Sequence, residues 1–230
     1  MRAILSAELA ALCDLSAAMV AADEATLVGS LQRALADADP ERVEETILQA
    51  YLFLGFPAAL EVMKHWREVA GLAAADGGSS VLEQKGAEPD GGGTDGAGTP
   101  DAWRSRGEEV CRRIYGANYE KLRANVKAVH RDLDRWMVTE GYGKVLGRPG
   151  LELSARELCI VAQLTAAERE VQLHSHLRGA LNAGATSGEV EAALRIGLQH
   201  VEQPEWARRV EQLWWTVRER VGRSRHAADS

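Results

Sequence analysis

Apolar residues recur at spacings of three and four along most of this 230-residue chain, and Ala, Glu, Arg and Gln fill many of the positions between them. This spacing gives each helix one apolar stripe, whereas half-buried strands need strict alternation, which is nearly absent here. The pattern therefore predicts an all-α fold. We expect helices over residues 3–22, 24–37, 40–54, 57–72, 103–115, 117–128, 131–145, 153–167, 169–184, 187–201 and 204–222.

Three of these helices also carry a local start signal. Pro40 and Pro204 stand in first turns, where the amide hydrogen that proline lacks is not needed. The run "TSGE", from Thr186 to Glu189, has the pattern of a capping box. The starts near residues 40, 187 and 204 therefore rest on local chemistry as well as on periodicity.

A glycine-rich stretch, "GGSSVLEQKGAEPDGGGTDGAG", interrupts the helical pattern from Gly77 to Gly98. It contains little apolar surface that could fix it against a core, so we interpret residues 74–100 as a flexible linker. The linker divides the chain into a first unit, residues 1–73, and a second unit, residues 101–222. The last residues, 223–230, are expected to form a disordered tail.

The two units resemble each other. Two stretches align without a gap, "LCDLSAAMVAADEATLVGSLQRALADAD" in the first unit and "LCIVAQLTAAEREVQLHSHLRGALNAGA" in the second. After one inserted residue the alignment continues to a shared proline. Helical spacing alone would not also align a cysteine and a proline, so we interpret the chain as a tandem of two related helical units. The matched pairs are Leu12 with Leu158, Cys13 with Cys159, Leu31 with Leu177, Val43 with Val190 and Pro57 with Pro204.

Composition and charge restrict the class of protein. An apolar content of 46% is enough for a good core without disulfides, and the three cysteines form no C-x-x-C pair. The net charge of -7 comes from interspersed acids and bases, which argues against a nucleic-acid partner. No apolar run is long enough to span a bilayer. We expect a cytoplasmic protein without a membrane partner.

The stretch "LHSHLRGALNAGA", residues 173–185, concentrates candidate chemistry. On a helix, Leu173, Leu177 and Leu181 form one apolar stripe, and His174 and His176 fall on its two opposite flanks. The two rings point about 160° apart, so they cannot chelate one metal ion. We expect no metal site and no cofactor here, and packing of the histidines at a core edge stays an alternative.

Glu157 lies in "RELCIVAQLTAA", a helix that is apolar on most of its circumference. A buried carboxylate without a hydrogen-bond donor costs several kcal/mol, so Glu157 needs a partner. The next helix offers His176. The alternative is a structural ion pair with an arginine, for which Arg156, Arg169 and Arg178 are the candidates.

Three segments of the chain resemble the carboxymuconolactone decarboxylase family, which includes alkylhydroperoxidase-like proteins. They are "RELCIVAQLTAAEREVQLHSHLRGALNAGATSGEVEAAL", the lead-in "LDRWMVTEGYGKVLGRPGLELS" and, in the first unit, "VEETILQAYLFLGFPAALEVM". The resemblance implies an all-helical fold, assembly into trimers or hexamers, and a site between helices near a subunit boundary.

The resemblance also suggests which branch of the family fits. The peroxidase branch has a glutamate, a C-x-x-C and a histidine, and the two cysteine positions here are Arg169 and Gln172. Thiol redox chemistry needs a thiolate and a resolving partner, so the decarboxylase branch fits better. A departure remains, because the second unit reads "HVEQPEWARRV" where the family has an apolar turn.

We therefore expect a carboxy-lyase that acts on a small carboxylated lactone or a related organic acid. The resemblance matches Glu157 and His176 to the family's glutamate and histidine, so we expect His176 to act as the acid with help from Glu157. Arg178, His174 and Arg148 are candidate contacts for the substrate. The alternatives are that Arg178 is solvated, that Arg148 anchors the "RPG" turn and that His174 is packing. The first unit has Ala11 and Ser30 at the matching positions, so we interpret it as degenerate. Alternatives are a non-catalytic binding or scaffold protein and, last, a peroxidase without the C-x-x-C.

An oligomer is also expected. The chain has more apolar helix than two small units need, and three tryptophans near its C-terminal end are typical of a buried interface. The simplest assembly is a homotrimer, in which three tandem chains supply six helical units. The tryptophans are Trp206, Trp214 and Trp215.

Overall fold

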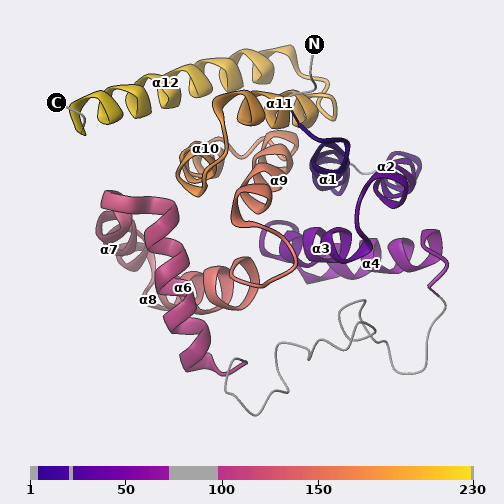
Figure 1. Cartoon of the computed structure of the whole chain (residues 1–230), viewed down its shortest axis with the longest axis horizontal. Helices are drawn as coiled ribbons and strands as arrows, with labels where there is room; N and C mark the ends of the chain where they lie inside the picture. Colours follow the sequence, from indigo (N-terminus) through magenta and orange to yellow (C-terminus); the bar gives the residue numbers. More distant parts are fainter. Residues whose placement is uncertain (1–4, 21–22, 73–97, 229–230) are drawn as a thin grey trace.

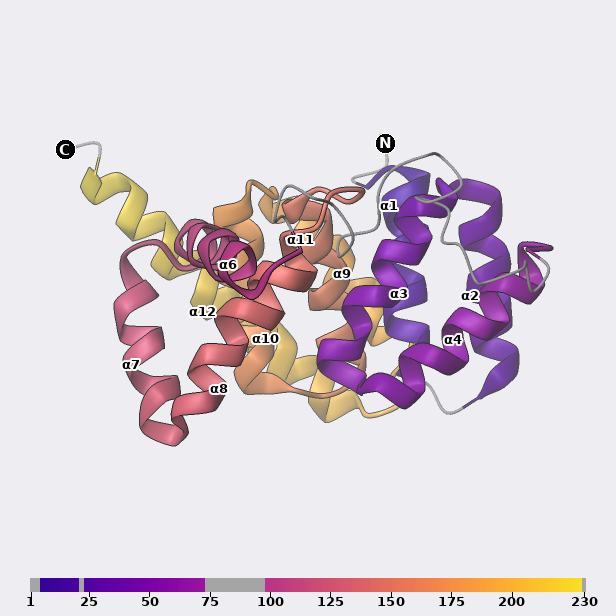
Figure 2. The same cartoon turned by 90° about the horizontal axis from the view of Figure 1, so that it is seen from below.

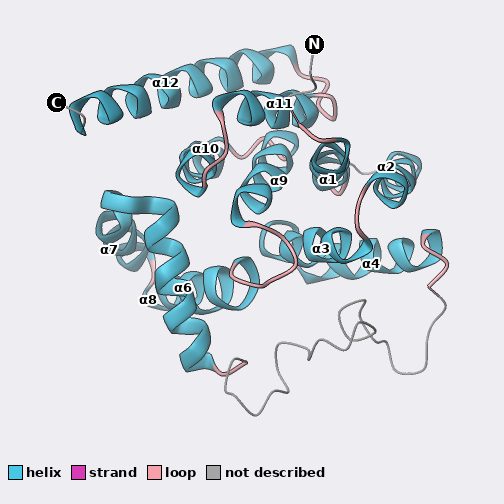
Figure 3. Cartoon of the chain, viewed as in Figure 1, coloured by secondary structure: helices cyan, strands magenta, loops and turns pink. Residues whose placement is uncertain are grey.

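The computed structural model describes residues 5–20, 23–72 and 98–228, and within these ranges every regular element is a helix (Figure 3). The predicted all-α class is confirmed. Most of the predicted linker falls outside the described residues, because they resume only at residue 98. None of the described helices is both long and apolar enough to cross a membrane.

Among the described residues, four helices precede the linker and the remaining elements follow it. The first group is α1 (Ala7–Ala18), α2 (Glu24–Asp37), α3 (Pro40–Leu54) and α4 (Phe56–Val69). The second group begins with α6 (Pro100–Tyr115), the 3₁₀ turn η1 (Gly116–Asn118), α7 (Tyr119–Val129), α8 (Arg131–Trp136) and the π-helix η2 (Met137–Leu146). It ends with α9 (Leu153–Ala166), α10 (Glu170–Ala183), α11 (Ser187–Leu198) and α12 (Pro204–Ala228).

The local start signals are confirmed. Pro40 and Pro204 are the first residues of α3 and α12, and Thr186 and Glu189 form the capping box of α11. Two predicted boundaries are wrong. Ser6 caps α1, so that helix starts later than residue 3, and α12 continues to Ala228, into the segment expected to be a disordered tail.

A single α-helix over residues 131–145 was also predicted, and its second half is instead the π-helix η2. This element lies against α6 at two glycines. A β-carbon on Gly107 would lie 1.9 Å from the carbonyl oxygen of Val138, and one on Gly143 would lie 1.9 Å from that of Trp103. Apolar spacing within one segment does not show how closely a second helix approaches it, because that distance depends on the second helix.

Helices α9, α10 and α11 lie between the α6–α8 group and the α1–α4 group in both views of the chain (Figures 1 and 2). Helix α9 contacts α1, α3, α10 and α11, and its residues from Ala155 to Thr165 are all buried. A continuous apolar core includes side chains from both groups of helices. The central position expected for the Glu157 helix is therefore observed.

The aligned cysteines meet in this core. Helix α1 packs against α9, and the thiols of Cys13 and Cys159 are hydrogen-bonded to each other with neither residue exposed. The contact brings matching positions of the two units together. That the units arose by duplication stays a prediction.

Candidate functional site

Glu157 and His176 form a buried pair between α9 and α10. Nδ1 of His176 lies 2.9 Å from Oε2 of Glu157, and the two residues are 7% and 0% exposed. An ionised carboxylate only accepts hydrogen bonds, so Nδ1 donates to it and Nε2 is left as the nitrogen that can exchange a proton. This geometry suits an acid/base group with a second residue that orients it.

Gly179 makes room for the pair on α10. A β-carbon at this position would lie 2.6 Å from Oε2 of Glu157 and 3.0 Å from the Ile114 side chain of α6. Real β-carbons essentially never show a contact as short as the one to Glu157, and the one to Ile114 would also be tight. The absence of a side chain at Gly179 therefore lets the carboxylate lie against α10 and reach His176.

The first group of helices contributes Phe53, from α3. Its ring meets the His176 imidazole edge to face, with 5.6 Å between the ring centroids and 78° between the ring planes. The imidazole is thus held between a carboxylate and an aromatic ring. Among the described residues, no group donates to the second carboxylate oxygen of Glu157, Oε1, although that atom is buried.

Two tyrosines lie in the electrostatic neighbourhood of Glu157. The hydroxyls of Tyr115 on α6 and Tyr142 on η2 are 2.7 Å apart. Burial raises the pKa of both phenols above their usual value, and the Glu157 carboxylate adds to the rise. Both hydroxyls therefore stay protonated near neutral pH and can act as hydrogen-bond donors. Sequence reasoning missed Phe53, Tyr115 and Tyr142, because helical spacing within one element does not show which residues of other elements pack against it.

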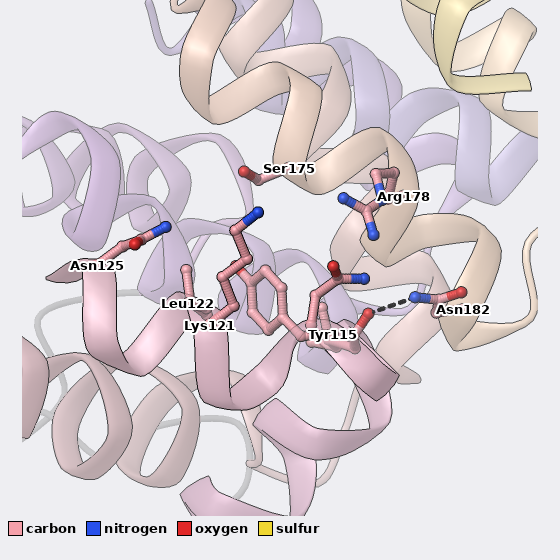
Figure 4. Close-up of a pocket in the computed structure, with 9 residues that line it drawn as sticks. Tyr115, Lys121, Leu122, Asn125, Ser175, Arg178 and Asn182 are labelled. Carbon is pink, nitrogen blue, oxygen red and sulfur yellow. Dashed lines mark hydrogen bonds between the residues drawn. The ribbon is translucent and has the colours of Figure 1, made fainter. Parts of the chain in front are cut away.

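A cavity of about 170 Å³ lies between α10 and the segment formed by α6, η1 and α7. Arg178 lines it from α10, and Lys121 lines it from α7 (Figure 4). Nδ2 of Asn182 donates to the carbonyl oxygen of Ile114 at 2.6 Å and so ties α10 to α6 at the cavity edge. The lining residues are Ile114, Tyr115, Asn118, Lys121, Leu122, Asn125, Ser175, Arg178 and Asn182.

Arg148 has a structural partner. Its guanidinium donates three hydrogen bonds, of 2.9 to 3.1 Å, to the carboxylate of Glu45, which is fully buried. Arg156, an alternative partner for Glu157, donates to the same carboxylate at 2.7 Å. Glu45 therefore holds both arginines at the junction between α3 and the segment before α9, and we leave Arg148 out of the proposed site.

His174 lies in an electrostatic environment of its own. Partial burial lowers its pKa, and the positive charges of Arg178 and of Arg220 on α12 lower it further. Neither His174 nor the Glu157–His176 pair lines the cavity, whereas Arg178 does. Since the hydrogen bond to Glu157 comes from His176, we leave His174 out of the proposed site, which retains Glu157, His176 and Arg178 from the sequence.

The cysteines are core residues, and a hydrogen bond with Cys13 lowers the pKa of Cys159 in spite of its burial. Cys13, Cys111 and Cys159 are buried and form no disulfide. Burial raises the pKa of Cys111 to about 12, so this thiol stays protonated at neutral pH. Arg169, at one of the two positions where a peroxidase has its cysteines, is exposed.

The matching positions of the first unit hold a different arrangement. Ser30 on α2 accepts a hydrogen bond from Nη2 of Arg33 at 2.9 Å, and the same nitrogen lies 2.6 Å from Asp14 on α1. A small alanine, Ala11, stands where the second unit has Glu157. An ion pair therefore occupies the region, and no acid/base pair like Glu157–His176 forms there.

Part of the chain is similar to known proteins. Residues 131–213 match the model of the carboxymuconolactone decarboxylase family. The chain is 31% identical over 87 residues to 4-carboxymuconolactone decarboxylase of Acinetobacter baylyi, a match that covers 37% of this chain and 65% of that protein. It is 32% identical over 95 residues to peroxisomal protein 2 of Schizosaccharomyces pombe, over 41% of this chain and 45% of that protein.

The chain thus spans less than two thirds of the length of either relative. The whole Glu157–His176 pair lies within the matched segment, together with Tyr142 and Arg178. Residues 131–213 of this chain are therefore similar to the carboxymuconolactone decarboxylase family.

Proposed function

We propose that the chain is a carboxy-lyase that releases CO₂ from a small carboxylated lactone or a related organic acid. The observation that carries the proposal is the buried Glu157–His176 pair within the family segment. The similarity to a protein named 4-carboxymuconolactone decarboxylase supports it.

The reaction requires a proton donor and a positive charge from the protein. The bond between the carboxylate carbon and its neighbour breaks, CO₂ leaves, and the electron pair passes into the conjugated carbonyl system as an enolate. His176, in its protonated form, then gives one proton to carbon and recovers one from solvent, while Glu157 holds the ring in position. Arg178 supplies a positive charge close to the developing oxyanion or to a second carboxylate.

The test replaces each member of the pair by its uncharged counterpart of similar shape. General acid/base residues contribute about 10²- to 10⁴-fold, so His176→Asn and Glu157→Gln should each lower the rate of CO₂ release by that factor. Both substitutes retain hydrogen-bonding groups, so the melting temperature should change little. Ser30→Ala, at the position of the first unit that matches His176, is the control and should keep the wild-type rate.

A purely structural pair would behave differently. Removing the imidazole by His176→Ala would leave a buried carboxylate unpaired and cost about 3 kcal/mol or more of folding free energy. If both conservative variants keep wild-type turnover, the acid/base role is wrong. If the wild-type protein releases no CO₂ from any carboxylated lactone offered, the lyase proposal fails and a binding or scaffold role takes its place.

A further inference from the structure

Two positively charged side chains, Lys121 and Arg178, line the cavity between α7 and α10, and the lyase proposal uses only Arg178. We infer that the cavity binds a small organic anion, whose carboxylate lies between Lys121 and Arg178. The two side chains extend into the space between the helices from opposite sides (Figure 4). An anionic oxygen placed there would meet an ammonium group on one wall and a guanidinium group on the other.

Lys121 and Arg178 differ in their ion pairing from most arginines near the core. Within the described part of the chain, no carboxylate lies within ion-pair distance of Lys121 or Arg178, and the cavity lining contains no acidic residue. The chain as a whole carries a net charge of -7, so two cations without acidic partners facing one cavity are a local reversal of sign. Arginines that do pair with a carboxylate include Arg33, Arg42, Arg123, Arg148 and Arg156.

The rest of the lining favours an organic ligand over a bare inorganic ion. Side chains of Ile114, Tyr115 and Leu122 give one part of the wall an apolar character. Asn118, Asn125 and Ser175 add groups that can donate hydrogen bonds to oxygen. A carboxylate joined to a small apolar body would use both parts, whereas inorganic phosphate would use only the polar one.

The cavity adjoins the acid/base pair through Tyr115. This residue lines the cavity, and its hydroxyl is bonded to that of Tyr142, in the neighbourhood of Glu157. Only the identification of the bound anion with the lyase substrate rests on the proposed function. The binding site itself is a separate inference, because affinity can be measured without turnover.

Much of the site also lies outside the family segment. The lining residues from α6, η1 and α7 precede residue 131, where the family match begins. Ligand choice would therefore depend on a part of the chain that the family match does not cover.

The experiment measures binding of benzoate, acetate and inorganic phosphate to the full chain by calorimetric titration at low ionic strength. Benzoate should bind most tightly, and raising the salt concentration should weaken it. Lys121→Gln and Arg178→Gln should each weaken benzoate at least about 10-fold, the loss expected for one charge-assisted contact. Lys127→Gln on α7 and Arg169→Gln before α10, both exposed and outside the cavity, are matched controls and should bind like wild type.

Several outcomes would overturn the inference. They are no benzoate binding up to about 10 mM, equal losses in the cavity variants and the controls, or unchanged affinity in both cavity variants. Phosphate binding as tight as benzoate binding would show that the organic part of the inference is wrong. His176→Asn protein should still bind benzoate normally, so failure of the lyase proposal and failure of the binding site give different results.

Discussion

Gly179 sets how closely the Glu157 carboxylate can approach α10. Because a β-carbon here would lie 2.6 Å from Oε2, Gly179→Ala must displace the carboxylate from His176 or push α10 away from α9. Glu157 is fully buried, so it has no open space to move into. We expect a loss of about 1–3 kcal/mol of unfolding free energy, as for other overpacked cores.

If the pair is catalytic, Gly179→Ala should lower turnover as well. Denaturant unfolding and CO₂ release measure the two effects. Gly29→Ala on α2 is the matched control, because its nearest neighbour would be 3.8 Å away, the end of the Arg33 side chain. There the change should stabilise the helix by up to about 1 kcal/mol. Wild-type stability in Gly179→Ala would contradict the geometry described for the pair.

At the scale of elements, helix α6 and the π-helix η2 are in close contact because two glycines face backbone carbonyls. Gly107→Ala and Gly143→Ala would each place a β-carbon 1.9 Å from such an oxygen. Because the oxygen belongs to the backbone, no side-chain rotation can relieve the clash. Each should cost about 3 kcal/mol or more, at the upper end of overpacking. Thermal unfolding measures this, and Gly141→Ala, whose nearest contact would be 4.0 Å away, should stay close to wild type.

The contact between α6 and η2 also positions two tyrosines of the candidate site. Tyr115 ends α6, Tyr142 lies on η2, and their hydroxyls meet only if the two elements keep this distance. The π-helix therefore helps to position the tyrosine pair, whose pKa values burial and the Glu157 carboxylate raise, and π-helical turns are frequent at functional sites in general.

At the scale of the whole molecule, Asp14 joins helices from the two units. Its carboxylate accepts hydrogen bonds from Arg33 on α2 and, at 3.0 Å, from His200 after α11. Burial by itself raises the pKa of Asp14, but hydrogen bonds from His200, Arg33 and Ser30 outweigh it and lower the pKa from 3.8 to about 2. The stabilisation is therefore fully present above about pH 4 and is lost as the pH falls through 2.

Asp14→Asn should thus be less stable than wild type at pH 7, by about 1 kcal/mol after solvent screening, and the difference should shrink between pH 4 and pH 2. Unfolding at a series of pH values measures the difference. Asp101→Asn, in an exposed ion pair with Arg104, should change little at any pH. A difference that stays constant from pH 7 to pH 2 would contradict the role given to the Asp14 charge.

We also propose that the chain forms a homo-oligomer, with a trimer as the simplest case. Trp206 and Trp214 do not form an interface as expected, because they are buried within the chain and donate to Thr165 and Glu191, whereas Trp215 is 59% exposed. Other apolar side chains support the proposal instead, since Phe56 and Leu60 on α4 are 65% and 50% exposed. Light scattering at micromolar concentration should give three times the 24.9 kDa chain mass, and a monomer would contradict the proposal.

The sequence by itself determined the helical class, most helix positions and the pairing of Glu157 with His176. Apolar spacing reports which face of one helix is buried, and a carboxylate on a helix that is apolar almost all round needs a partner. That reasoning led from Glu157 to His176, which the structure places 2.9 Å apart. Start signals at Pro40, Thr186 and Pro204 worked for the same reason, because a first turn is decided by a few neighbouring residues.

Only the tertiary structure decided the surroundings of the pair. Phe53 reaches His176 from α3, Lys121 faces Arg178 across a cavity, and Arg148 pairs with Glu45 instead of remaining available for substrate. Each contact joins segments that are distant in sequence, and the π-helix at Gly143 likewise depends on how closely α6 approaches. A periodic pattern specifies which side of a helix is buried, but not which remote side chain will meet it, because that depends on how all the helices pack together.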